Sequence, residues 1–209
     1  AEKWGGIRWY RDYEEMLEKD EEIDAVTICV PSGLHHEVAI AAAQAGKHVL
    51  CEKPLAVNAD EAEQMIAAVD ETGVFMMEAF MYRCHPQTQK LIDLIREGAI
   101  GEVRAIHASF GYDLGESDAA YRNIRLRNDV CGGSIMDVGC YTISMARLVA
   151  GAALGMDAPA EPERLAGVAH IGARGRVDEW AAAVVRYPGG IVANLACASR
   201  VRMDNWVRV

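Results

Sequence analysis

Lys53, Asp137 and Tyr141 have side chains and positions suited to proton transfer. Lys53 follows the apolar run Val49–Cys51, which is typical of a buried parallel strand. Pro54 has no N–H to donate to a strand ladder, so the strand must end before it. Ligands of open α/β sheets bind outside the carboxyl ends of the strands, which predicts a catalytic role for Lys53. The alternative interpretation is a lysine that merely ends a strand at the surface.

Asp137 and Tyr141 are four residues apart, so a helix would carry both side chains on one face. Asp137 would lie in the first turn, where a carboxylate suits the helix dipole, and the preceding Gly132-Gly133 would let a ligand or another backbone approach. A tyrosine can act as general acid or base if its pKa falls from about 10. A lysine ammonium or an oxidised nicotinamide ring would lower it. The alternative is an aromatic core residue beside a helix cap.

Composition bounds the kind of protein. The chain has 209 residues, of which 51% are hydrophobic and 25% charged, as in an ordinary globular protein. A formal net charge of −10 disfavours a nucleic-acid partner and an anionic membrane surface. No apolar run reaches the roughly 18 residues of a membrane span, and the first residues hold no signal-peptide core. The six cysteines form no C-x-x-C pair, and Cys29 and Cys51 are expected in the core, so we expect a reducing cytoplasmic location.

The first half of the chain alternates strands and helices. A helix is expected over 13–19, a strand over 23–30, a helix from 35 or 36 to Gly46, a strand over 49–51, a helix from 58 to Gly73, and a strand over 74–77. Asn58 and Glu61 have the spacing of a capping box, and the buried stripe of that helix is predicted to be Ala62, Met65, Ile66 and Val69. This alternation predicts βαβ units and a parallel sheet.

The second half has a different pattern. A helix is expected over 86–97, a strand over 103–111, a polar loop over the site at 112–131, a helix over 134–150 closed by Gly151, and strands over 165–171, 179–187 and 191–199. Pro188-Gly189-Gly190 predicts a hairpin between the last two strands. The predicted fold is therefore α/β: a partial Rossmann-type parallel sheet in residues 1–100, followed by an α+β domain with a mostly antiparallel sheet in residues 101–209.

Several motifs resemble the Gfo/Idh/MocA oxidoreductases, the glucose–fructose oxidoreductase and inositol dehydrogenase superfamily. They are Asp24-Ala25-Val26, Pro31-Ser32-x-x-His35, Ala45-Gly46-Lys47-His48-Val49-Leu50-Cys51-Glu52-Lys53-Pro54, and Gly132-Gly133-Ser134-x-x-Asp137-x-Gly139-x-Tyr141. The third and fourth motifs together are the specific ones. Tyrosine at 141 and Met81-Tyr82-Arg83-Cys84 resemble the branch with glucose–fructose oxidoreductase, NADP-dependent xylose dehydrogenase and dimeric dihydrodiol dehydrogenase.

The resemblance implies an NAD(P)-dependent dehydrogenase that acts on CH–OH groups of a sugar or a cyclic diol, with NADP favoured over NAD. It implies Lys53 and Tyr141 as the proton-transfer pair and Asp137 as a ligand of a substrate hydroxyl. The cofactor side would be lined by Pro31, Ser32, His35, Glu52, Lys53, Pro54 and Arg83. It further implies a homo-oligomer formed through the antiparallel sheet. No metal site is expected, because His85 and His107 lack partners at ligand spacing.

The sequence also departs from the family pattern, and these departures leave other interpretations of the chain open. No G-x-G-x-x-G turn is present, and Gly5-Gly6 stands alone. A βαβ unit takes about 30 residues or more, so we expect an internal fragment of a longer enzyme that is inactive on its own. A non-catalytic ligand-binding or assembly member of the same fold is the other alternative.

Overall fold

The computed structural model describes residues 8–209, so Gly5 and Gly6 lie outside the described part of the chain. The chain forms two compact units, residues 1–79 and 80–209. The sequence places the boundary near residue 100. The structural boundary lies earlier than the sequence boundary because α4 (Pro86–Arg96) packs against α5 (Cys140–Ala153). The segment that contains α4 therefore belongs to the second unit.

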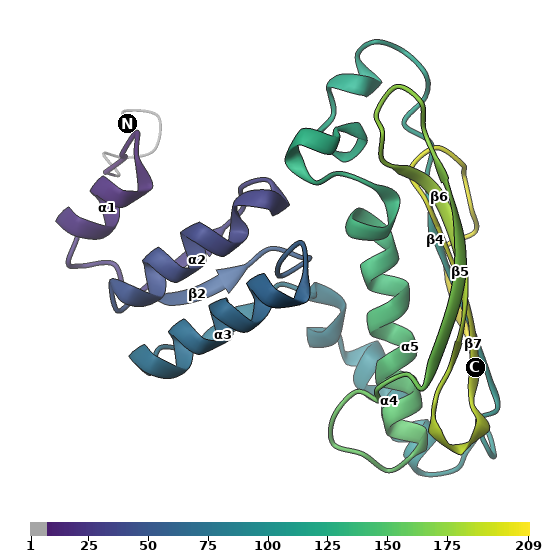
Figure 1. Ribbon diagram of the computed structural model, residues 1–209. Helices are drawn as coiled ribbons and strands as arrows, with labels where there is room; N and C mark the ends of the chain where they lie inside the picture. The colour runs from purple at the N-terminus through teal and green to yellow at the C-terminus, as the bar shows by residue number, and fades with distance from the viewer. Residues whose placement is uncertain (1–7) are drawn as a thin grey trace. The chain divides into compact units, whose positions relative to one another are not determined.

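The first unit is a parallel sheet with helices on one face. Strands β1 (Ala25–Ile28), β2 (His48–Cys51) and β3 (Met76–Glu78) lie side by side in that order and all run parallel. Helices α2 (His35–Gln44) and α3 (Ala59–Thr72) cover one face, and α1 (Tyr13–Lys19) adds Tyr13 and Leu17 to the same core (Figure 1). The predicted alternation of strand and helix is confirmed.

The local signals of α3 act as expected. The Asn58 side chain accepts a hydrogen bond from the Glu61 backbone N–H at 2.8 Å, which satisfies one of the unpaired donors at the helix start. Gly73 ends the helix with a left-handed φ of +70°. The predicted stripe is wrong at Ile66, which is 48% exposed, whereas Met65 and Ala68 are buried.

The two cysteines of this unit differ in environment. Cys51 is fully buried, and burial raises the pKa of its thiol to about 12. Cys29 is exposed, so its expected place in the core is wrong. Ile28 points toward the helices, and successive side chains of an extended chain alternate in direction, so Cys29 points away from them.

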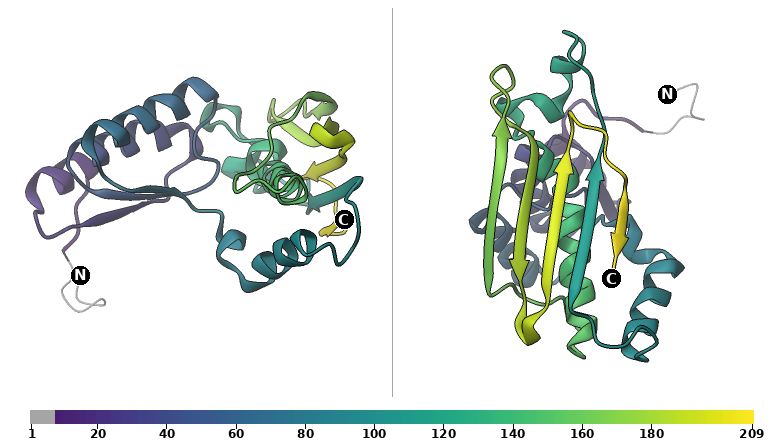
Figure 2. Two further views of the ribbon diagram at one scale, coloured as in Figure 1. Left: turned by 90° about the horizontal axis from the view of Figure 1, so that it is seen from below. Right: turned by 90° about the vertical axis from the view of Figure 1, so that its right-hand side faces the viewer.

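The second unit is a five-stranded sheet with helices on one face. Its strands are β4 (Ala105–Gly111), β5 (Arg164–Ile171), β6 (Asp178–Arg186), β7 (Val192–Ala198) and β8 (Trp206–Arg208), in the order β5-β6-β7-β4-β8. Only the β4–β7 pair is parallel, so the predicted mostly antiparallel sheet is confirmed. Helices α4 and α5 lie on one face, and the other face is open in the right-hand view of Figure 2.

Helix α5 supplies most of the core of this unit. Val149 and Ala150 are fully buried against Ile106 and Tyr187 of the sheet. The helix runs to Ala153, so Gly151 does not close it. A Cβ on Gly151 would lie 2.3 Å from the carbonyl oxygen of Ala158, so this glycine is needed for the close approach of the following segment.

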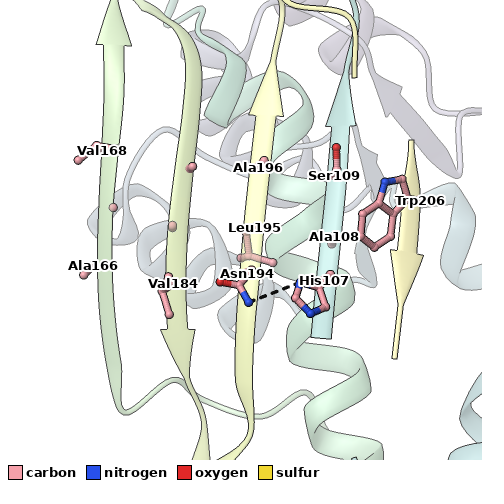
Figure 3. A pocket seen from close by; sticks show the side chains of 13 residues that line it. His107, Ala108, Ser109, Ala166, Val168, Val184, Asn194, Leu195, Ala196 and Trp206 are labelled. Atoms are coloured by element: carbon pink, nitrogen blue, oxygen red, sulfur yellow. Dashed lines mark hydrogen bonds between the residues drawn. The ribbon is translucent and has the colours of Figure 1, made fainter. Parts of the chain in front are cut away.

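The open face of the sheet carries a shallow hollow of about 590 Å³ across β5 to β8. Figure 3 shows His107 beside Asn194, with the Trp206 side chain on the neighbouring strand. Val168 and Val184 on this face are 79% and 49% exposed. Within residues 8–209, no helix is both long enough and apolar enough to cross a membrane.

Candidate functional site

In the first unit, the predicted site residues follow the carboxyl ends of the parallel strands. β2 ends at Cys51, and Glu52, Lys53 and Pro54 follow it in that order. Both ring nitrogens of His35 face backbone carbonyl oxygens, which can only accept: Nδ1 lies 2.8 Å from the carbonyl oxygen of Pro54, and Nε2 lies 3.0 Å from that of Val30. The backbone N–H of Leu55 donates to the Glu78 carboxylate at 2.8 Å, which ties the same segment to the end of β3. The peptide that carries Lys53 is therefore held from both neighbouring strands.

This geometry changes the interpretation of His35. Its side chain is only 1% exposed, and both ring nitrogens are engaged by backbone carbonyls of its own unit. The His35 ring therefore holds backbone segments of its own unit together. The sequence motif alone does not distinguish this structural role from a contact with a cofactor. Pro31, Ser32 and Glu52 are partly exposed around it.

In the second unit, Asp137 is the centre of a cluster of side chains. The Arg125 Nε lies 3.0 Å from Asp137 Oδ1, and the Tyr112 hydroxyl donates to Oδ2. The Asp137 side chain is 11% exposed, whereas that of Arg125 is 43% exposed. Burial, together with the hydrogen bond to Asp137 and its negative charge, raises the pKa of Tyr112 above its ordinary value. Tyr112 is therefore held as a neutral donor, and the carboxylate is fixed from two sides.

The glycine pair before Asp137 makes room for protein atoms. A Cβ on Gly132 would lie 2.4 Å from the Ile124 carbonyl oxygen, and one on Gly133 would lie 2.2 Å from Asp178 Oδ1. The first contact brings the 3₁₀ turn η5 (Ile124–Leu126), and with it Arg125, beside the start of the helix. The close neighbour of Gly132 is therefore another backbone, as one of the two sequence alternatives has it, whereas that of Gly133 is a side chain.

The helix start itself differs from the prediction. Ile135–Gly139 form a turn of π-helix before α5 begins at Cys140, and such turns are frequent at functional sites. Asp178 Oδ2, from β6, accepts from the Ile135 N–H at 2.7 Å. Asp178 therefore caps the helix start, a role that the sequence offered as an alternative for Asp137. Asp137 instead contacts Arg125 and Tyr112.

Tyr141 lies among aromatic rings of its own unit. Its ring centroid is 5.3 Å from that of Phe80, 5.5 Å from Phe110 and 6.2 Å from Tyr82. Offset and edge-to-face contacts at these distances hold a ring without using its hydroxyl. The side chain remains partly exposed, so packing and a chemical role are both compatible with its position.

Arg83 is exposed but not isolated. Its Nη2 donates to the Ser144 hydroxyl at 3.1 Å, and the Tyr82 hydroxyl donates to the same oxygen at 2.8 Å. These bonds tie the 3₁₀ turn η3 (Met81–Cys84) to α5. Among residues 8–209, no group of three or more histidine, cysteine, aspartate or glutamate side chains could hold a metal ion.

Sequence reasoning missed Arg125 and Tyr112. Both lie within or next to the segment that was expected to be a loop over the site, and neither has a spacing to Asp137 that a helix or a strand would reveal. The available signal was weaker: a charged and an aromatic side chain in a segment expected to cover the site.

A parallel sheet with helices on one face, followed by a unit with a mostly antiparallel sheet, gives a two-unit α/β architecture. The chain belongs to the Gfo/Idh/MocA oxidoreductase family. Residues 1–80 match the oxidoreductase family domain with its NAD-binding Rossmann fold, and residues 88–209 match the family's C-terminal domain.

Sugar and diol dehydrogenases are among the proteins to which the chain is similar. The chain is 44% identical over 151 residues to D-xylose 1-dehydrogenase (NADP(+)) 2 of Haloferax volcanii, which is 72% of this chain and 45% of the relative. It is 32% identical over 205 residues to trans-1,2-dihydrobenzene-1,2-diol dehydrogenase of Mus musculus, which is 98% of this chain and 57% of the relative. The crystal structure of KijD10, a 3-ketoreductase from Actinomadura kijaniata in complex with NADP and TDP-benzene, matches with a TM-score of 0.80 and 33% identity over 99% of this chain and 59% of that one. The chain thus spans roughly half the length of these proteins.

Proposed function

We propose that the protein is an NAD(P)-dependent dehydrogenase that oxidises a CH–OH group of a sugar or a cyclic diol. The observation that carries the proposal is the position of Lys53, just after the end of β2 at the carboxyl edge of a parallel sheet, in a chain that matches both domains of the family. The named relatives that act on xylose and on a dihydrodiol support this substrate class.

Lys53 and Tyr141 form the proton-transfer pair of this proposal. A nicotinamide cofactor held at the carboxyl edge of the first unit would supply the hydride acceptor for the carbinol carbon. Tyr141 takes the hydroxyl proton as the carbonyl forms, and the Lys53 ammonium favours the tyrosinate by its positive charge. Tyr112 is the less suitable base, because burial and Asp137 raise its pKa.

Asp137 positions the substrate in this scheme. Each carboxylate oxygen can accept more than one hydrogen bond, so Asp137 can accept one from a substrate hydroxyl while Arg125 and Tyr112 hold it. The half-exposed guanidinium of Arg125 would lie beside the same hydroxyl. A neutral polyol suits this ion pair better than a charged substrate, since the two side chains already cancel in charge.

The carboxyl edge of the first unit fits the nicotinamide end of the cofactor. Pro31, Ser32, Glu52, Lys53 and Pro54 are partly exposed there, so a ring can reach them. We assign His35 the task of holding Pro54, because its ring is engaged by two carbonyls. The choice of NADP over NAD rests on the relatives named with NADP.

We also propose that the open face of the second unit's sheet pairs with a second copy of the chain. This face carries four large, exposed apolar side chains, those of Val168, Trp180, Val184 and Trp206. Several such side chains on one face, unlike single ones, are typical of an interaction surface. Sedimentation velocity should report a dimer or larger assembly, and Val184→Glu should shift it toward the monomer. A monomer for the unchanged protein would refute this part of the proposal.

Turnover tests the proton-transfer pair. In the full-length enzyme, Tyr141→Phe and Lys53→Met should each lower kcat by roughly 100-fold or more, the usual scale for acid/base participation, with a smaller change in KM. Tyr141→Phe keeps the ring contacts to Phe80 and Phe110, so its thermal unfolding should stay near that of the unchanged protein. Near-normal kcat in Tyr141→Phe would remove Tyr141 from the mechanism. Absence of NADP(H)-dependent turnover with D-xylose or trans-1,2-cyclohexanediol would favour a non-catalytic binding role.

A further inference from the structure

Four arginines of the second unit converge on one hollow of about 620 Å³, between the 118–129 segment and the turn that joins β5 to β6. The hollow shares no lining residue with the Asp137 cluster. Its charged walls are Arg122, Arg127, Arg174, Arg176, Asp118 and Asp129. For a chain with a net charge of −10, this is a local reversal of sign.

The two aspartates neutralise only two of these arginines. Arg174 Nη2 lies 2.6 Å from Asp118, and Arg127 Nε donates to Asp129 at 3.1 Å. Within residues 8–209, neither Arg122 nor Arg176 has a carboxylate in ion-pair contact. The hollow therefore keeps two positive charges that its own carboxylates do not cancel.

The walls are held in place by close backbone packing. A Cβ on Gly175 would lie 2.4 Å from the Leu126 carbonyl oxygen, so the β5–β6 turn touches the backbone of η5. This contact brings Arg174 and Arg176 beside Arg122 and Arg127. Beneath them, Leu126 and Val177 belong to one small core cluster.

Tyr121 fixes one wall. The Arg174 guanidinium lies 4.3 Å from its ring centroid, and the largely buried Arg200 donates from Nη1 to its hydroxyl at 2.6 Å. A guanidinium stacked on an aromatic ring and paired with a carboxylate is pre-oriented, so less rotamer freedom is lost when it binds a ligand.

Arg176 has an unfavourable backbone conformation for its type. Its φ is +56°, in the left-handed region that glycine adopts more readily. An arginine at such a position is a reason to look for a role of its side chain, because strained residues cluster at ligand sites.

We propose that this hollow binds a phosphoryl group. A phosphate carries about −1.5 to −2 charges at pH 7 and several acceptor oxygens, which matches two uncompensated guanidiniums with forked donors. A carboxylate ligand would carry one charge and repeat the contacts that Asp118 and Asp129 already make. The ligand class is a small phosphate-bearing molecule or a free inorganic phosphate, which share this chemistry.

Calorimetric titration of the full-length protein at low ionic strength tests the site without any need for turnover. The probes are inorganic phosphate, pyrophosphate and glucose 6-phosphate, with sodium chloride at matched ionic strength as the blank. The test variant is Arg122→Gln/Arg176→Gly; glycine suits the left-handed backbone at 176, so the fold should tolerate the change. The matched control is Arg104→Gln, because Arg104 is an exposed arginine that pairs with Glu102 away from the hollow.

We expect saturable binding that weakens at least tenfold in the double variant and less than twofold in the control. Tighter binding of glucose 6-phosphate than of inorganic phosphate would identify an organic phosphate as the ligand type; the reverse order would identify the free anion. Absence of saturable binding to the unchanged protein, or equal affinity in the double variant, would overturn the proposal.

Discussion

The candidate site residues of the two units are held in different ways. In the first unit, the segment with Lys53 is fixed mainly through backbone groups: carbonyls of Val30 and Pro54 on the His35 ring, and the N–H of Leu55 on Glu78. In the second unit, Asp137 is fixed by side chains, Arg125 and Tyr112, from separate segments.

Because of this difference, the two units should respond differently to substitutions and to pH. Backbone contacts around a buried ring fail when the ring is removed, because two carbonyls lose their partner and a cavity is left. Contacts between charged and ionisable side chains respond to pH and to single substitutions with little loss of packing. The first unit should therefore respond in stability, and the second in substrate binding and pH dependence.

The largest expected effect is that of His35→Ala. Loss of a fully buried ring and of its contacts with two backbone carbonyl oxygens should destabilise the first unit by roughly 2–4 kcal/mol. Hydrogen exchange of peptides from residues 25–79 should accelerate, while exchange in β4–β7 should change little. His36→Ala is the control: the partly exposed His36 has its Nε2 2.8 Å from the Gln64 side-chain oxygen, and its loss should cost less than about 0.5 kcal/mol. Equal effects of the two variants would show that His35 does not hold this edge.

Replacement of Arg125, whose guanidinium contacts Asp137, should weaken substrate binding. Arg125→Met is expected to raise KM for a sugar or diol substrate by about tenfold, which is about 1.4 kcal/mol, since Asp137 then loses one of the two groups that orient it. Because the Arg125 side chain is 43% exposed, solvent screening should keep the stability change small, near 1 kcal/mol or less. Arg104→Gln serves again as the exposed-arginine control. An unchanged KM together with unchanged kcat would mean that Arg125 has no part in positioning.

Tyr112 gives the second unit a pH dependence. Its folded-state pKa is raised above the unfolded value, so above about pH 10 the unfolded chain loses this proton before the folded chain does, and stability falls as pH rises. Tyr112→Phe should be less stable than the unchanged protein at pH 8 by roughly 1–2 kcal/mol, through the lost hydrogen bond to a carboxylate. The difference in unfolding free energy between the two proteins should be smaller at pH 11 than at pH 9. Urea unfolding at these two pH values measures it. A gap that stays constant would show that Tyr112 titrates normally.

The smallest effect concerns cysteine reactivity, which contrasts an exposed and a buried thiol in each unit. Iodoacetamide at pH 7.5 should label Cys29 and Cys84, which are exposed, and spare Cys51 and Cys197, whose pKa values burial raises to about 12. Mass spectrometry of peptides gives the labelling order. Fast labelling of Cys51 would mean that the sheet of the first unit opens readily.

The order of elements could be predicted from the sequence because it depends on short-range patterns. Alternating apolar runs with glycine and capping signals, as at Asn58 and Gly73, predicted helices and strands within a few residues. Long elements with clear period, such as β6 and β7, were also correct. Ile66 and Cys29 were misplaced because the direction in which an apolar side chain points depends on which face a helix covers, and that face is not encoded in the local pattern.

The sequence by itself determined where Lys53, Asp137 and Tyr141 stand relative to strand ends and helix starts, since proline, glycine and apolar periodicity act through the adjacent backbone. Only the tertiary structure decided what surrounds them. Arg125 reaches Asp137 because the backbone of Gly132 packs on η5, and Arg176 joins Arg122 because Gly175 packs on Leu126. Such contacts join residues with no fixed spacing in the chain, so they depend on how the loop and the sheet fold onto each other.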